Sequence, residues 1–589
     1  MPDTIFSVNS IKNTCKILAL YFGFFLLVTT IYLFWYGINQ TIIIPANHFI
    51  SEEGFSYWID LTHLDHSELH SQADTLDEPT KSRLIILESG KEIGSRHSIH
   101  ADIRRIGEGY FSHWSNGVYL STSDNTDPRT NNRVYAIEYR TYPEEVYAYT
   151  TVILVLIILA WNHNLVLKVL RRLLANDARF VTIITAVSLL IMLALLESGF
   201  RYFTPFELKQ WPIQFYPSVG FHFKPNAEIK HTNYLDFWVT DKSNSWGFLD
   251  KETPLTSTKT CHVSLIGDSF VEAAQVELPY KVQRLLENWA YVRHPDWKLT
   301  TSAFGYSGTG QLNQLPFYTK YARHLKPNLV ILVFVSNDFA NNSSVLEALR
   351  NGWHPDSTPR VFSKIAKDGT FKLTDIDPDW QNKRLKEVTN TSKDNTIHKR
   401  LINSSYLYRW VWLKLSLLAP SLEALAGPTQ ADRILNRAHQ LFQDPSVAPR
   451  LTGWKVSFAN DIDRPLHELY LPKIYRDTIN ATRFALQEFK KLTDSDGARL
   501  ILLAASQFKT SAGGKDKMYY ASQRLKMIAD ELEIPLIDQY NFIQQQGGNP
   551  LAAQFKHDAH WTKQGHRWAA EAILNYLEKN ISTCQQNQT

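Results

Sequence analysis

Three long apolar segments constrain this 589-residue chain more than any other feature of its sequence. They cover residues 17–36, 146–167 and 180–197 and hold a single charged residue, Glu197. A helix needs about 20 apolar residues to cross roughly 30 Å of hydrocarbon, so each segment is a candidate transmembrane helix. The first ends in Phe34-Trp35-Tyr36, which suits a retained anchor at the membrane interface better than a cleaved signal peptide. The third is short enough to be a buried core helix instead.

Basic residues predict how these segments are oriented. Two lysines precede the first segment, and four basic residues lie between the second and the third: Lys12, Lys16, Lys168, Arg171, Arg172 and Arg179. Because cytoplasmic loops carry the excess of Lys and Arg, both clusters are predicted to be cytoplasmic. Residues 1–16 and 168–179 then lie inside, and residues 37–145 and 198–589 lie outside. We therefore expect an integral membrane protein with two extracytoplasmic domains.

The overall composition excludes several other classes of protein. Lys and Arg number 62 against 58 Asp and Glu, and this near-balance argues against a dedicated nucleic-acid binder. A mean hydropathy of −0.26 is too low for a channel or transporter with many spans. Three cysteines are too few for a disulfide scaffold.

Residues 37–145 are polar and rich in turns, which predicts a small all-β domain. Short runs carry the β-branched or aromatic residues typical of strands, at 84–87, 118–121 and 134–139. Ser89-Gly90 predicts a hairpin turn after the first of them. We expect a β-sandwich or a jelly roll. The polar loop at 121–131 lies beside aromatic residues, so it either binds a sugar or covers a small core.

The region after residue 198 alternates buried strands with helices. The predicted strands are 261–266, 329–335, 498–505 and 534–538, and the predicted helices include 277–290, 473–492 and 519–532. Such alternation indicates an α/β fold with a doubly wound parallel sheet. In such sheets, ligand sites form beyond the carboxyl ends of the strands.

A candidate nucleophile, Ser269, follows the first of these strands in the turn Gly267-Asp268-Ser269-Phe270. A serine there begins a helix, whose N–H groups and dipole can stabilise a developing oxyanion. Gly-Asp-Ser alone would be an ordinary turn. However, Gly305, in a glycine-rich loop, and Asn337 also follow strands, so all three residues are predicted to meet at one edge of the sheet.

A candidate general base lies near the C-terminus in the sequence His557-Asp558-Ala559-His560-Trp561. A serine nucleophile needs a base, and an imidazole needs a carboxylate to fix its tautomer. The Asp-x-His spacing favours His560 as the base with Asp558 as its partner. His557 and His566 are the rival bases.

These four blocks resemble the SGNH/GDSL hydrolase superfamily of membrane-anchored bacterial type, over roughly residues 215–580. The resemblance implies a flavodoxin-like sheet and an enzyme that cleaves or transfers acyl esters without a cofactor or a metal. It implies that Ser269 is the nucleophile, that His560 is the base and that Asp558 orients it. It also implies an oxyanion hole formed by the Ser269 N–H, Gly305 and Asn337.

The chain departs from the superfamily at two points. The usual acid–base pair is Asp-x-x-His, whereas the shorter Asp558-Ala559-His560 is similar to polysaccharide O-acetyltransferases of the alginate-modifying type. Val335 stands where many members have the glycine of Gly-x-Asn-Asp. The first departure leaves hydrolysis and acyl transfer both open.

The sequence therefore predicts a membrane-anchored serine esterase or O-acyltransferase that acts on acyl esters, most simply acetyl esters, of extracytoplasmic carbohydrate. A transferase would need a separate membrane protein as its acyl donor, because this chain lacks a domain with many spans. One alternative is a lipase or thioesterase acting on membrane lipids. Another is a non-catalytic scaffold for assembly of envelope polysaccharide.

Overall fold

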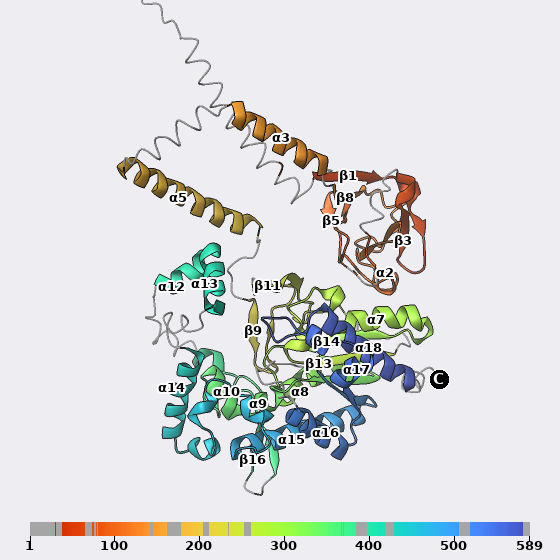
Figure 1. Cartoon of the computed structure of the whole chain (residues 1–589). Coiled ribbons are helices and arrows are strands. Elements are labelled where there is room, and N and C mark those ends of the chain that lie inside the picture. The colour runs from red at the N-terminus through yellow and green to blue at the C-terminus, as the bar shows by residue number, and fades with distance from the viewer. Residues whose placement is uncertain are drawn as a thin grey trace, which may run out of the picture. The chain divides into compact units, whose positions relative to one another are not determined.

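The computed structural model forms two compact units, residues 1–198 and 199–589 (Figure 1). Besides Thr30, it describes residues 38–141, 145–161, 178–203, 211–252, 261–383, 397–418, 429–505 and 519–580, apart from 65–72, 76–77, 79, 234, 367 and 369.

The first unit contains two antiparallel sheets of four strands, ordered β1-β8-β4-β5 and β2-β3-β7-β6. The strands are β1 (Ile38–Ile44), β2 (Ile50–Ser51), β3 (Tyr57–Asp60), β4 (Ile85–Glu88), β5 (Lys91–Glu92), β6 (Phe111–Trp114), β7 (Gly117–Leu120) and β8 (Tyr135–Thr141). Side chains from both sheets share one buried core, as a sandwich requires. The predicted turn joins β4 to β5, with positive φ at both Ser89 and Gly90.

Two helices occupy the positions of the second and third apolar segments. They are α3 (Glu145–Trp161) and α5 (Ala178–Phe203). The first segment, 17–36, lies outside the described residues except for Thr30. Within the part of the chain that the structure describes, no helix combines the length and apolar character needed to cross a membrane. The prediction of three transmembrane helices is therefore not supported by the structure.

The second unit is built on a five-stranded parallel sheet ordered β14-β13-β15-β18-β19. Its strands are β13 (His262–Gly267), β14 (Thr300–Gly305), β15 (Leu329–Phe334), β18 (Arg499–Ala504) and β19 (Leu536–Asp538). Every residue of the first three is buried, as expected of strands covered on both faces. Numbered along the chain, the order is 2-1-3-4-5, the flavodoxin-like arrangement. The predicted doubly wound α/β sheet is therefore confirmed.

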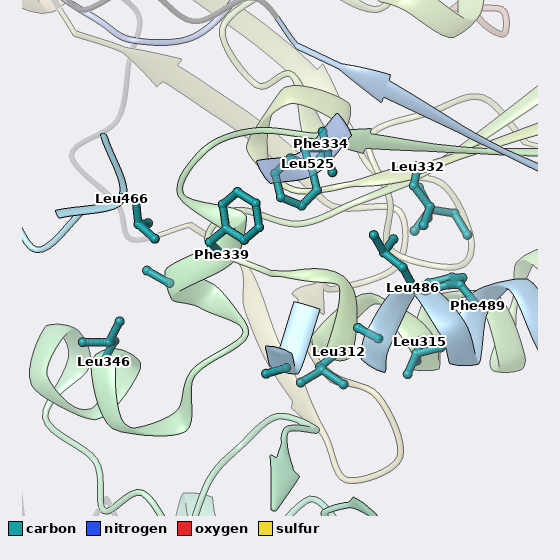
Figure 2. Close-up of a cluster of buried hydrophobic side chains, with 14 of the residues drawn as sticks. Leu312, Leu315, Leu332, Phe334, Phe339, Leu346, Leu466, Leu486, Phe489 and Leu525 are labelled. Atoms are coloured by element: carbon teal, nitrogen blue, oxygen red, sulfur yellow. The ribbon is translucent and has the colours of Figure 1, made fainter. Parts of the chain in front are cut away.

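Helices cover both faces of this sheet (Figure 1). On one face α7 (Val282–Arg293) packs against α18 (Lys563–Lys579), and on the other α8 (Gln311–Lys320) packs against α15 (Lys473–Ser495). Figure 2 shows the apolar core beneath the second face, where Leu332 of β15 lies near Leu486 of α15 and Phe334 packs against Phe339.

Shorter elements complete the second unit. They are the hairpins β9 (Ile213–Tyr216) with β10 (Gly220–Phe223), β11 (Glu228–Thr232) with β12 (Trp238–Lys242) and β16 (Ser363–Ile365) with β17 (Phe371–Leu373), and the helices α6 (Ser269–Glu272), α9 (Asp338–Asn341), α10 (Ser344–Asn351), α12 (Ile397–Ser404), α13 (Tyr406–Leu418), α14 (Gln430–Gln443), α16 (Tyr519–Glu531) and α17 (Gln539–Gln545). Because α6 and α9 directly follow β13 and β15, they begin at the carboxyl edge of the sheet.

Candidate active site

Ser269 lies at the carboxyl end of strand β13, where it begins the short helix α6. Asp268 caps this helix, since its carboxylate accepts a hydrogen bond of 3.0 Å from the Phe270 N–H. Asp268 is fully buried, whereas Ser269 is half-buried. The cap therefore comes from Asp268, which leaves the Ser269 hydroxyl available for chemistry.

Gly305 ends β14 directly beside Gly267, with which it pairs in the sheet. A Cβ atom built on Gly305 would lie 2.2 Å from the backbone nitrogen of Glu272 in α6. Only glycine allows the nucleophile helix to approach the sheet this closely. The structure thus brings Gly305 to the same edge as Ser269, and its role as an oxyanion donor stays a prediction.

Asn337 lies between β15 and α9, with its side-chain amide turned toward the end of β13. Its Nδ2 is 2.9 Å from Asn341 Oδ1 and 3.4 Å from Asp268 Oδ2. The Ser269 hydroxyl is also 3.4 Å from Asp268 Oδ2. Because both groups approach one carboxylate oxygen, the Asn337 amide and the Ser269 hydroxyl are neighbours.

His560 is held by Asp558 in the loop before α18. Its Nδ1 is 2.5 Å from Asp558 Oδ1, and the same oxygen accepts the His560 backbone N–H at 2.9 Å. This contact leaves Nε2 as the nitrogen that can take up a proton. The His560 ring lies 5.3 Å from the ring of Phe270, so the imidazole lies against the residue that follows Ser269.

Asp558 and His560 each stabilise the charged form of the other. Burial alone would raise the pKa of Asp558, but the hydrogen bond and positive charge of His560 outweigh it and hold that pKa below its ordinary value. Burial alone would lower the pKa of His560, but Asp558, Asp268 and Glu272 together raise it above 6.5. The arrangement thus stabilises the imidazolium that forms when His560 accepts a proton.

Among the contacts of the described residues, neither rival histidine combines a carboxylate partner with a ring contact to Phe270 in the helix that Ser269 begins. His557 Nδ1 lies 3.0 Å from Asp236, whose carboxylate also accepts the His557 backbone N–H. His566 is buried, and burial lowers its pKa to about 3. Its Nδ1 accepts a hydrogen bond of 3.3 Å from the Val282 N–H. These environments favour His560 as the base.

Glu272 was not predicted as a site residue; it lies one helical turn after Ser269 and is buried. Its carboxylate accepts hydrogen bonds from the Ser307 N–H at 2.7 Å and the Ser307 hydroxyl at 2.9 Å. Burial raises its pKa to about 7 against the effects of Ser307, His560 and Lys281. The only signal in the sequence was its spacing of three residues from Ser269. That spacing does not reveal the contact with Ser307.

The comparisons with known proteins give structural neighbours only. No family model and no curated protein matches the chain. Among solved structures, an acetylxylan esterase from Geobacillus stearothermophilus shares 10% identity over 53% of this chain and 92% of its own, with a TM-score of 0.27. A GDSL-like lipase from Bacteroides thetaiotaomicron shares 12% over 56% and 93%, with a TM-score of 0.23.

A lipolytic protein of the G-D-S-L family from Desulfitobacterium hafniense shares 10% identity over 54% of this chain and 99% of its own, with a TM-score of 0.25. Identities and TM-scores this low do not establish an activity, so an activity has to be inferred from the geometry of the site residues.

Proposed function

We propose that this chain is an SGNH/GDSL-type serine esterase whose catalytic residues are Ser269, His560 and Asp558. The observation that carries the proposal is the Asp558–His560 pair, packed against the helix that Ser269 begins. Nucleophile, base and orienting carboxylate are the three parts that acyl transfer through a serine requires.

In the proposed reaction, the Ser269 hydroxyl attacks the carbonyl carbon of an ester while His560 Nε2 takes its proton. The N–H groups of Ser269 and Gly305 and the Asn337 Nδ2 stabilise the tetrahedral oxyanion. His560 then protonates the departing alcohol, which leaves an acyl group on Ser269. Water, or the hydroxyl of an acceptor, attacks this acyl-enzyme as His560 removes its proton. The bond between the acyl group and Ser269 Oγ then breaks, His560 returns the proton to that oxygen, and the acid or the new ester leaves.

We propose acetyl esters of extracytoplasmic carbohydrate as the substrate. Two sequence features support this choice: the Asp-x-His spacing, and the β-rich domain with its polar loop at 121–131. Transfer to a sugar hydroxyl is the finer version of the proposal and requires a separate membrane protein as the acyl donor.

The substrate class is tested with the full chain in detergent and a series of p-nitrophenyl esters of increasing acyl length. We expect kcat/KM to be highest for acetate and to fall as the acyl chain lengthens, because an acetyl esterase offers little apolar surface to a long chain. A preference for long acyl chains would instead support the lipase or thioesterase alternative. Failure of a fluorophosphonate probe to label Ser269 would support the non-catalytic scaffold.

We further propose that the chain is anchored in a bacterial inner membrane with its catalytic unit in the periplasm. The basis is the sequence pattern of three apolar segments and two basic clusters. Cys261, directly before β13, is disulfide-bonded, and disulfides persist in oxidising compartments such as the periplasm.

Membranes from an expressing strain test this topology. We expect the chain to stay with the membrane after an alkaline wash, and external protease to reach residues 199–589 once the outer membrane is permeabilised. Release of the chain by the wash would contradict the anchor. Protection of the catalytic unit in intact inner-membrane vesicles of native orientation would contradict the periplasmic location.

A further inference from the structure

A buried carboxylate outside the proposed triad, Glu347 of α10, receives hydrogen bonds from four side chains. Glu347 is 1% exposed. Its donors are Asn341 at 2.9 Å, Asn351 at 2.9 Å, Arg350 at 2.5 Å and Arg360 at 3.5 Å. An ionised carboxylate can only accept hydrogen bonds, so all four neighbours must turn an N–H toward it.

One of these neighbours links Glu347 to the proposed oxyanion hole. Asn341 donates through Nδ2 to Glu347, which turns its Oδ1 the other way. That Oδ1 accepts the Asn337 Nδ2 at 2.9 Å. The amide of Asn337 is thereby oriented with its nitrogen, rather than its oxygen, beside Ser269. The side chains of Asn341 and Asn337 form a relay of two amides that donates toward Glu347, and Asp268 Oδ2, which lies 3.4 Å from Asn337 Nδ2, accepts from the same nitrogen.

The other oxygen of Glu347 faces the loop that follows Gly305. It lies 3.5 Å from Arg360, which donates to the backbone carbonyls of Ser307, at 3.4 Å, and Gly308. Ser307 is bound in turn by Glu272 of the nucleophile helix. The contacts of Glu347 therefore reach two parts of the proposed oxyanion hole. Through Asn341 they reach the side chain of Asn337, and through Arg360 they reach the loop that follows Gly305.

We propose that Glu347 is a positioning residue that sets the polarity of the Asn341–Asn337 relay, so that Asn337 presents an N–H to the oxyanion. An amide reversed at Asn337 would present its oxygen to a negative charge and oppose the transition state. A glutamine at position 347 can both donate and accept, so it satisfies either direction of the relay. The inference rests on the proposed esterase function.

The test is Glu347→Gln in the full chain, assayed with p-nitrophenyl acetate. Loss of an oxyanion donor typically costs about 10²–10³ in kcat. Glu347→Gln keeps the Asn337 side chain and only weakens the preference for one orientation of its amide, so we expect kcat to fall by about 10- to 100-fold. We expect KM to change less than about 2-fold, because the oxyanion forms only after the substrate has bound.

Glu287→Gln is the matched control. Glu287 is also 1% exposed and pairs with Lys251 and Arg284, but it contacts Thr301 at the amino end of β14. Both variants remove one buried charge from an arginine-containing network, so both are expected to lower the melting temperature. Only Glu347→Gln is expected to lower kcat. If the two variants lose kcat equally, then Glu347 has only a structural role and the inference is overturned.

A double-mutant cycle tests whether the effect passes through Asn337. In an Asn337→Ala background, Glu347→Gln is expected to cause no further loss of kcat, because the group that it orients is gone. Additive losses would overturn the relay. If Glu347→Gln does not fold, Asn341→Ala interrupts the same relay and is expected to show the same loss and the same lack of additivity. A wild-type chain that hydrolyses no ester would contradict the proposed function itself, whereas an active wild type with an equally active Glu347→Gln would contradict only the relay.

Discussion

Replacing Ser269 with alanine is expected to lower kcat for p-nitrophenyl acetate by roughly 10⁶-fold, the loss typical of a missing serine nucleophile. Without the hydroxyl no acyl-enzyme can form, and only binding and the oxyanion donors remain to accelerate attack by water. The fold should be unaffected. The only hydrogen bond of the Ser269 hydroxyl to a described side chain is the long one to Asp268, and Asp268 itself caps α6.

The measurement is steady-state hydrolysis together with a thermal melt of each protein. Ser264→Ala is the control, because Ser264 lies on the same strand, is fully buried and bonds to Ser302 away from the sheet edge. It should keep the wild-type rate. If Ser269→Ala hydrolyses the ester as fast as the wild type, then Ser269 is not the nucleophile and the proposed site is wrong.

Replacing His560 with alanine is expected to reduce kcat by a similar factor of roughly 10⁶, because the base and the nucleophile act as one unit. Asp558→Asn should cost less, about 10⁴, since the imidazole remains but loses the partner that fixes its tautomer. His557→Ala is the control and should leave kcat nearly unchanged, because that imidazole is bound to Asp236 instead. A large loss in His557→Ala and none in His560→Ala would reverse the assignment.

The pH dependence of the wild type provides an independent check on His560. The base must be neutral to accept the Ser269 proton, and the neighbouring carboxylates raise its pKa above 6.5. The protonated, inactive form therefore persists to higher pH than in an isolated histidine. We expect kcat/KM to fall as the pH is lowered, with a midpoint above 6.5. A midpoint well below 6.5 would show that the carboxylates do not control this histidine.

The sheet, and the edge of it where the candidate site lies, could be predicted because both depend on local signals. Strands such as Leu329–Phe334 are continuous apolar runs, and in a parallel sheet the residues after each run must meet at one edge. Pattern alone therefore placed Ser269, Gly305 and Asn337 together. The flavodoxin-like order came from the family resemblance, because strand periodicity carries no information on which strands pair.

The supporting residues could not be predicted, because they act through contacts between distant segments. Nothing local to Glu347 distinguishes it from a helix surface acid, and its burial depends on Arg360 and Asn341 arriving from other elements. The choice among His557, His560 and His566 was different, because the local spacing of Asp558 and His560 already favoured His560. What could not be predicted is the partner of His557, since Asp236 lies 321 residues away in sequence and binds it only in the folded protein.

The order of the strands also determines when the protein can first become active during its synthesis. Ser269 and Asn337 belong to strands made early, whereas His560 follows the last strand of the sheet and precedes its final helix. From Ser269 to His560 the ribosome must add 560 − 269 = 291 residues, which takes roughly 15–60 s at about 5–20 residues per second. Throughout that interval the nascent chain carries its nucleophile without a base. Under the proposed mechanism, activity therefore begins only once the chain has been made through His560, and a truncated product that lacks His560 is expected to be inert toward esters.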